Sequence, residues 1–489
     1  MESLSYEAFP VQKYVRKLRK QRVVECVIPA EDVEKTLSLT ASGEIVSMEN
    51  LQGETNLSGT IRFSLLYLNH EDEVASLSYK ADFSDAVKDD AITTTSRAFL
   101  SVDVVDCTVE KAGEGECKAQ CVVELTLLLT EREELNCLNA APGVFVKSED
   151  KKIQLFETSL SDVFQIEEEK TVPGIVSGIL SSDGEAIVTQ ADFDNGRFVL
   201  EGLFCVNVNY RKEDDYDSLS LQIPFREEVE YAGEGDFKVC PSVAVCELNV
   251  IAAVDEEKKE TVLTAAAELR ATLDVLKCEE RALTVDAFVK DYVCNAQITG
   301  VNSLELCEQI CSRAGVDGRI DCDKSIDRIL AVAEPRIHIA NVGAENGEFT
   351  AEGVLTASVV YLDEENRKGC FEVEVPFRTD PERLEGEVAE IFSRGIVCDI
   401  HARLRLRGEL EISFKCQIVS HVFREQGLCA VSGMEVLSEY RNSSLISVYV
   451  PSAEDSVFEV SKELNADPAS IDLDQFLEGK KVVVFRGGM

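Results

Sequence analysis

Three segments of the chain share one alternation of apolar and polar positions. They read LSGTIRFSLLYLNHED (57–72), LEGLFCVNVNYRKEDD (200–215) and AEGVLTASVVYLDEEN (351–366). In each, a glycine stands eight residues before a tyrosine, and every second position between them is apolar. A period of two is typical of a strand with one buried face. The pattern therefore predicts three equivalent strands, each with a core tyrosine and each followed by an acidic turn. The glycine and tyrosine pairs are Gly59/Tyr67, Gly202/Tyr210 and Gly353/Tyr361.

The similarity extends beyond these strands. A phenylalanine follows each tyrosine at a nearly constant distance, at Phe83, Phe225 and Phe377. The tripeptide at 145–147 recurs at 288–290, and this offset is the same as that between Gly59 and Gly202. A shared offset at distant points indicates duplication. Because each copy is rich in short alternating runs, we expect a mainly β chain with three tandem repeats, each a sandwich or a barrel-like sheet.

The boundaries follow from where the repeated pattern begins and ends. We place a basic N-terminal segment at 1–22 and β repeats at 23–147, 165–290 and 316–440. A different module occupies 444–487. There, the alternating positions Ile446, Val448 and Val450 predict a strand that ends at Pro451, and residues 452–455 supply helix-capping side chains. A first helix over 452–464, a second through 469–471 and a closing strand at 482–485 make this module α+β.

Charge excludes several kinds of partner. The 489 residues include 49 Lys and Arg but 91 Asp and Glu, which gives a formal net charge of −42. Binding to nucleic acid or to an anionic membrane rests on clustered positive charge, so neither is expected. The first residues lack the order of a secretory signal, and no apolar stretch approaches the length of a membrane span. These features favour a cytoplasmic protein without membrane insertion.

Residues with catalytic or metal-binding chemistry show no recognisable arrangement. The 17 cysteines are scattered through expected strands, contain no Cys-x-x-Cys pair, and have only four histidines to accompany them. We interpret them as buried free thiols and expect no metal and no cofactor. The sequence also lacks a nucleophile elbow, a phosphate-binding loop and a His-Glu-x-x-His motif. We therefore expect no enzymatic activity.

Two basic features stand out against the acidic background. The first is the stretch 13–22, which carries six Lys and Arg and which we interpret as a helix. It could dock on an acidic partner or on the chain's own acidic surface. The second is the run Arg403, Arg405 and Arg407, which shares one strand face. Cross-strand pairing with Glu409 and Glu411 is its expected role.

Both the repeats and the closing module resemble known families. The repeated Glu-Gly…Tyr and Pro-Phe pattern resembles the SPOCS domain, and the module resembles a LysM domain through VFEVSKEL (457–464), Pro-Ala-Ser-Ile (468–471) and Gly-Lys-Lys-Val (479–482). Tandem SPOCS domains followed by LysM form the layout of SipL-like spore coat assembly proteins. The resemblance implies a scaffold of the spore envelope on the mother-cell side of the forespore. Its implied partner is a coat morphogenetic protein, a SpoIVA-like ATPase.

The LysM resemblance also places a candidate binding edge. In this chain Ala453-Glu454-Asp455-Ser456 replaces the usual Gly-Asp-Thr, and the usual Asn-Pro is missing. Because those loops form the sugar groove, their loss favours a protein partner over the alternative, peptidoglycan or another N-acetylglucosamine polymer. Val457 has the helical spacing of Val460 and Leu464, which makes Phe458 the expected exposed anchor. Helix capping explains Glu454 and Asp455 as well as binding does. The candidate partner-binding residues are Pro451, Glu454, Asp455, Val457 and Phe458.

Overall fold

A computed structural model of the chain describes twelve stretches of residues. They are 4–113, 115–139, 141–212, 215–289, 292–321, 325–345, 347–384, 386–405, 409–439, 446–451, 457–458 and 483–486. Every regular element in these stretches is a strand. The prediction of a mainly β chain is therefore confirmed.

The first set of six strands folds as a two-sheet sandwich. It comprises β1 (Tyr6–Pro29), β2 (Val33–Leu51), β3 (Glu54–Asn69), β4 (Val74–Lys88), β5 (Ser96–Gly113) and β6 (Glu116–Leu138). One sheet has the order β2-β3-β4, and β1, β6 and β5 form the other. A single core fills the space between them, with the fully buried side chains Ile61, Phe63 and Leu65 from β3 at its centre. The alternation seen in the sequence thus marks the middle strand of the first sheet.

Two further sets of strands repeat this arrangement, and we call the three sets repeats 1, 2 and 3 in chain order. The second comprises β7 (Val144–Pro173), β8 (Val176–Asp194), β9 (Arg197–Lys212), β10 (Asp215–Glu230), β11 (Asp236–Asp255) and β12 (Glu260–Val289). The third comprises β13 (Tyr292–Asp321), β14 (Ile326–Glu345), β15 (Glu348–Asp363), β16 (Lys368–Arg378), β17 (Glu382–Arg383), β18 (Glu390–Leu404) and β19 (Glu409–Glu439). Each again has one core between two sheets. Residues 148–164 and 291–315, which lie between the expected repeats, fall largely within the long strands β7 and β13.

The repeated glycine and phenylalanine are direct partners across two strands. Gly59 pairs with Phe83, and Gly202 and Gly353 pair with Phe225 and Phe377 in the same way. In each repeat the strand on the other side of the glycine has a bulge. A Cβ on Gly202 would clash with the Phe225 ring and lie 2.5 Å from the carbonyl oxygen of Ile187. Only glycine therefore fits beneath the aromatic ring at this position.

The three sandwiches lie side by side, and repeats 1 and 3 are joined at the edges of their sheets. A single backbone register contact, between Lys13 and Ser303, joins β1 to β13 and creates one six-stranded sheet from repeats 1 and 3. Repeat 2 shares no sheet with the others within the described residues. The acidic turns also link repeats, since Arg211 pairs with Glu73, and Lys368 pairs with Asp72 at 3.1 Å. These turns are therefore structural contacts between copies.

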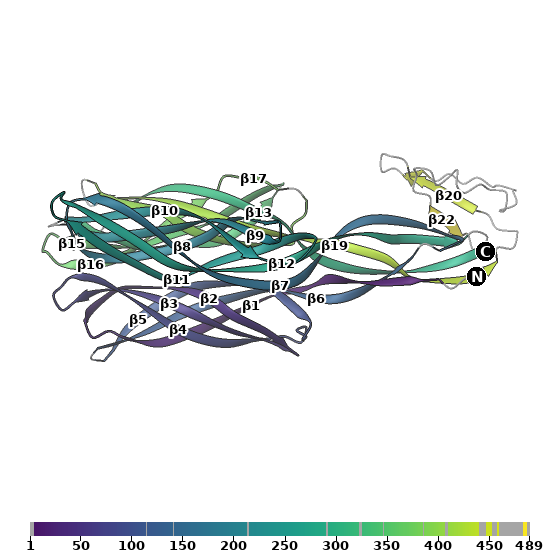
Figure 1. Cartoon of the computed structure of the whole chain (residues 1–489), viewed down its shortest axis with the longest axis horizontal. Coiled ribbons are helices and arrows are strands. Elements are labelled where there is room, and N and C mark those ends of the chain that lie inside the picture. The colour runs from purple at the N-terminus through teal and green to yellow at the C-terminus, as the bar shows by residue number, and fades with distance from the viewer. Residues whose placement is uncertain are drawn as a thin grey trace.

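Long strands from all three repeats extend beyond the sandwiches as a common stalk (Figure 1). We define the stalk by 6–12 of β1, 132–138 of β6, 144–156 of β7, 278–289 of β12, 292–303 of β13 and 426–439 of β19. A core cluster with members from all six strands fills its centre, including the fully buried Val11, Leu135, Leu283 and Leu428. Three two-stranded ribbons thus bury their apolar faces on one another, which a lone ribbon cannot do.

The helix expected at 13–22 is wrong, because these residues lie in β1 and pair along β6. The cations of the segment meet acids of the same chain. Lys13 pairs with Glu133 at 2.9 Å, Lys20 with Asp85 at 2.9 Å, and Lys17 with Glu390 of repeat 3 at 2.7 Å. The sequence left open whether this segment docks on an acidic partner or on the chain's own acidic surface, and the structure contains the second of these contacts.

The second basic feature is the arginine run at 403–407. Cross-strand pairing of Arg403 with Glu411, at 2.5 Å, follows the prediction, whereas Arg407 lies outside the described residues.

The described parts of 444–487 are strands only. β20 (Ile446–Pro451) pairs antiparallel with β22 (Val483–Arg486), in agreement with the two strands expected there. The α+β prediction with a first helix over 452–464 is contradicted at Val457–Phe458, which form β21 and pair with Val450 and Pro451. Extended pairing at these two positions excludes helical geometry for them. The expected second helix lies outside the described residues.

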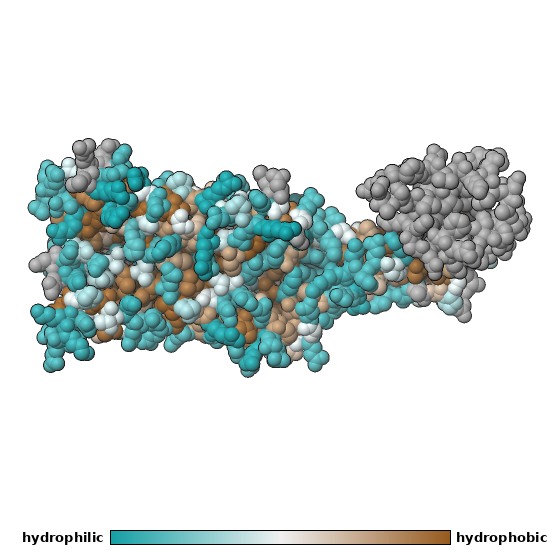
Figure 2. Space-filling model, turned by 90° about the horizontal axis from the view of Figure 1, so that it is seen from above, coloured by the Kyte–Doolittle hydropathy of each residue, from teal (hydrophilic) through white to brown (hydrophobic). Residues whose placement is uncertain are grey.

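Polar side chains dominate the surface in Figure 2, with apolar side chains between them. The described residues contain no helix with the length and apolar character of a transmembrane span. Seven of the described cysteines are buried and the others are half-buried or exposed, so the expectation of buried thiols holds for only part of them. The core tyrosine of repeat 2, Tyr210, is 3 % exposed, and burial is the first cause that raises its pKa to about 12.

Candidate functional site

The candidate binding edge at 451–458 is only partly within the described residues. Pro451 ends β20 and pairs with Val457, while Phe458 pairs with Val450. Glu454 and Asp455 lie outside the described residues. The backbone therefore brings three of the five candidate residues to one end of a strand pair.

A second candidate site lies where the three repeats meet. It consists of five charged side chains, which we call the inter-repeat charge cluster. Repeat 1 supplies Arg62, repeat 2 supplies Asp183 and Glu185, and repeat 3 supplies Glu334 and Arg336. Arg336 lies 3.8 Å from Asp183 and 3.8 Å from Glu185. All three copies therefore contribute charge to one place.

Backbone geometry explains how Glu334 enters this cluster. A bulge in β14 between Ala333 and Arg336 turns the strand, and Glu334 adopts a φ of 56°. Its N–H donates to Asp183 Oδ2 at 2.9 Å, which fixes β14 against β8. A left-handed φ is uncommon for a residue other than glycine and persists only where the surroundings hold it. Pro335 follows, and the residue before a proline avoids the right-handed helical region.

Burial and the charges of the cluster keep one carboxyl group partly protonated at neutral pH. Glu334 is 2 % exposed, and its carboxyl oxygens make no hydrogen bond of good geometry, although the Ser38 and Ser64 hydroxyl groups lie near them. Burial, followed by the Asp183 carboxylate, raises the pKa of Glu334 to about 7, while Ser38, Arg336 and Ser64 act in the opposite direction. Burial and the neighbouring Arg336 lower the pKa of Arg62. The cluster therefore holds a proton that an exposed glutamate would lose.

Neighbouring polar residues fix the register between repeats without charge. The Asn209 side chain donates to the carbonyl of Val332 at 2.9 Å and accepts from its N–H at 3.1 Å. Ser38 of repeat 1 and Ser358 of repeat 3 are hydrogen-bonded at 2.7 Å. These contacts join neighbouring repeats at the junction, and the Asn209 side chain also donates to Ser181 of its own repeat at 3.0 Å.

The sequence shows these residues but not their role. Arg62, Asn209 and Ser358 lie on the polar face of the three alternating strands, opposite the core face. From the sequence alone, that face is only the polar side of the alternation. The available signal was that small or polar side chains recur there in all three copies, as expected where one sheet packs on another repeat.

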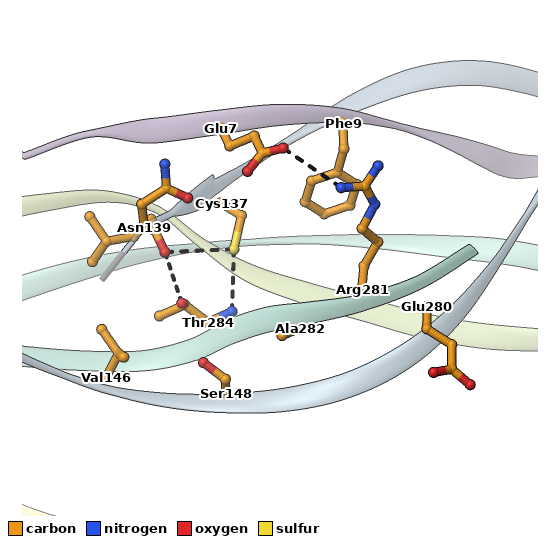
Figure 3. A pocket seen from close by; sticks show the side chains of 11 residues that line it. Glu7, Phe9, Cys137, Asn139, Val146, Ser148, Glu280, Arg281, Ala282 and Thr284 are labelled. Atoms are coloured by element: carbon orange, nitrogen blue, oxygen red, sulfur yellow. Dashed lines mark hydrogen bonds and ion pairs between the residues drawn. The ribbon is translucent and has the colours of Figure 1, made fainter. Parts of the chain in front are cut away.

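A pocket of about 400 Å³ opens in the stalk between the ribbons of repeats 1 and 2 (Figure 3). Phe9 and Cys137 lie on one side and Thr284 on the other. The N–H of Thr284 donates to Cys137 Sγ at 3.2 Å, and its hydroxyl donates to the carbonyl of Leu138 at 2.8 Å. Arg281 in the pocket is paired with Glu279 at 2.9 Å and lies 3.7 Å from Glu7. Its cation is therefore already neutralised by the chain.

These features define a chain of β-sandwich repeats that share a stalk. Residues 32–112, from the start of β2 to the end of β5, match the family model of the SipL SPOCS domain. No curated protein and no solved structure matches the chain. The match supports a relationship to the SipL-like family and, with it, a role connected with sporulation or the spore coat.

Proposed function

We propose that this protein is a non-enzymatic scaffold of spore envelope assembly that acts in the mother-cell cytoplasm. The observation that carries the proposal is the SPOCS match at 32–112, within the first of three similar sandwiches. The proposed role needs a stiff spacer with a binding element at one end. Buried contacts between repeats and a common stalk core supply the stiffness. The chain continues beyond β19 from the stalk tip, where Glu439 pairs with Tyr292.

The proposed binding element is the LysM-like segment 444–487, and its proposed partner is a coat morphogenetic protein, a SpoIVA-like ATPase. Protein binding fits the replaced Gly-Asp-Thr and the missing Asn-Pro better than sugar binding does. The alternative, binding of N-acetylglucosamine polymers, is tested in the same experiment. Phe458 remains the proposed anchor as an aromatic residue of this segment, although the helical spacing that first favoured it does not apply to the extended pair Val457–Phe458.

The experiment measures binding of the full chain to a purified SpoIVA-like ATPase and, separately, to chitin oligomers. Truncation of an aromatic anchor at an interface centre typically costs about 2 kcal/mol or more, which is about 30-fold in affinity. Phe458→Ala should show that loss. Ile251→Ala, which truncates a 56 % exposed side chain on β11, is the matched control and should bind as the unchanged chain does.

Thermal unfolding followed by circular dichroism shows whether each variant keeps its fold. Unchanged ATPase binding by Phe458→Ala with an intact fold would remove this residue from the interface. Micromolar binding of chitin oligomers, with no binding of the ATPase, would replace the proposal by the carbohydrate alternative.

A further inference from the structure

Repeats 2 and 3 share no sheet within the described residues, and two cysteines lie in the contact between them. Cys205 of β9 and Cys398 of β18 are 1 % and 6 % exposed. They belong to one apolar cluster with Ile187, Ile396 and Val419. The neighbouring Cys205 thiol lowers the pKa of Cys398, so the two side chains interact across this contact. The two cysteines are distant in the sequence, and only the packing of one repeat on the other brings them together.

A β-bulge aims Cys398 at this contact. The β18–β19 register shifts between Val397 and Asp399, so Cys398 is the extra residue and has no partner on β19. Bulges redirect a side chain out of the regular alternation. The carbonyl of Cys398 in turn accepts from Gln222 of β10 at 3.4 Å, which holds the bulge against repeat 2.

The other two repeats have a bulge at the equivalent place but not a pair of thiols. The bulge residue is Cys246 in β11 and Val105 in β5. Cys246 lies near the charge of Arg62, which occupies the position on β3 that Cys205 occupies on β9. The bulge of repeat 2 thus lies near Arg62 of repeat 1, and that of repeat 3 lies in one cluster with Cys205 of repeat 2, whereas Val105 in repeat 1 is 46 % exposed. This difference between copies is what separates the pair from the chain's other buried thiols.

We propose that Cys205 and Cys398 form a disulfide that locks repeat 2 to repeat 3 when the protein meets a peroxide-class oxidant. The Cys398 sulfur attacks the peroxide O–O bond, becomes a sulfenic acid and releases water. The Cys205 sulfur then attacks the Cys398 sulfur, the S–S bond forms, and the hydroxyl leaves as a second water with the Cys205 proton. Two electrons pass from the two sulfurs to the peroxide. The neighbouring Cys205 thiol lowers the pKa of Cys398, which favours initial attack by the Cys398 sulfur.

The lock has a clear structural consequence. Repeat 2 is the repeat without a shared sheet in the described part of the chain, so the disulfide adds a covalent link where the backbone supplies none. The surrounding apolar side chains shield the bond from soluble thiols, so reduction should be slow in the folded protein. Disulfides that close long loops restrict the unfolded chain most.

Peptide mapping tests the proposal on the full chain. Reduced protein is treated with hydrogen peroxide in native buffer, remaining thiols are alkylated, and tryptic peptides are analysed without reduction. The sequence gives peptides 198–211 and 395–403, each with a single cysteine, so the expected disulfide is one linked pair of defined mass. Cys205→Ser and Cys398→Ser should each abolish it. Cys416→Ser, which removes another buried thiol on the adjacent strand, should retain it.

Two internal comparisons decide the outcome. Cys107 and Cys121 are directly opposite each other on β5 and β6, but lie within one repeat and have pKa values raised by burial to about 12 and about 11. The 205–398 link should form before a 107–121 link. The oxidised chain should unfold at a higher urea concentration than oxidised Cys398→Ser. The proposal is overturned if the link appears only in urea, or if exposed Cys311 and Cys429 are oxidised while the 205–398 link stays absent.

Discussion

Glu334→Gln is expected to make the protein more stable at pH 8 and to change little at pH 5. The substitution keeps the size of the side chain and removes its charge. In the folded chain burial, followed by the neighbouring Asp183 carboxylate, raises the pKa of this carboxyl group from 4.5 to about 7. An isolated ionised carboxylate in such a place is unfavourable, and the neutral acid is tolerated.

The direction of the pH dependence follows from proton binding. Between about pH 4.5 and 7 the folded chain keeps the Glu334 proton, whereas the unfolded chain has lost it. Stability therefore falls as the pH rises through this range and stays low above it. At about 1.4 kcal/mol for each tenfold change in proton affinity, the difference between 4.5 and about 7 corresponds to about 3 kcal/mol. Glutamine does not titrate, so the variant escapes this loss.

The assay is urea denaturation of both proteins at pH 5, 6, 7 and 8, compared as differences in the unfolding midpoint. Other groups with shifted pKa values, such as Asp274 at about 6 and His421 at about 4, titrate in both proteins and cancel in the difference. Glu228→Gln, at an exposed ion pair with Arg197, is the matched control and should show no such trend. A stability difference that is the same at all four pH values, or a variant less stable than the unchanged chain at pH 8, would refute the reasoning.

Two smaller perturbations test the packing within and between repeats. Gly202→Ala should lower the free energy of unfolding by about 1–3 kcal/mol, because the new Cβ forces Phe225 from its place. In the control Gly178→Ala the Cβ would meet open space, so the loss should be well under about 1 kcal/mol. Chemical denaturation of both variants measures the difference. A double-mutant cycle with Lys17→Met and Glu390→Gln should give a coupling energy of about 0.5–1 kcal/mol that decreases in high salt, because this ion pair is partly exposed. Zero coupling would show that β1 is held to repeat 3 by other contacts.

Local pattern was enough to place the middle strand of each repeat. Ile61, Phe63 and Leu65 alternate because one face of β3 meets the core, and that information lies within a few consecutive residues. The motif Gly…Tyr…Phe was also visible, but its reason was not. It depends on a cross-strand register that places Phe83 over Gly59, and only the folded sheet shows that pairing.

Features that depend on distant partners were the ones that sequence reasoning missed. The cations of β1 were interpreted as one face of a helix, although they pair with acids far away in the sequence, such as Asp85 for Lys20. Residues 148–164 of β7 and much of β13 fall between the expected repeats, because in the stalk a ribbon has half-exposed side chains on both faces and the alternation weakens. A period of two reveals one buried face, and it says nothing about what covers the other.

The face of each middle strand that lies opposite its own core explains why the sequences of the three copies differ where they touch. Equivalent sandwiches around a common axis could pack in more than one order unless their contacts differ. The position held by Arg62 in repeat 1 is Cys205 in repeat 2 and Thr356 in repeat 3, so each seam has its own chemistry. A buried charge placed against the wrong copy would lose its partner and become strongly unfavourable. Arg62 of repeat 1 near Asp183 of repeat 2 therefore favours one arrangement of the repeats over the others.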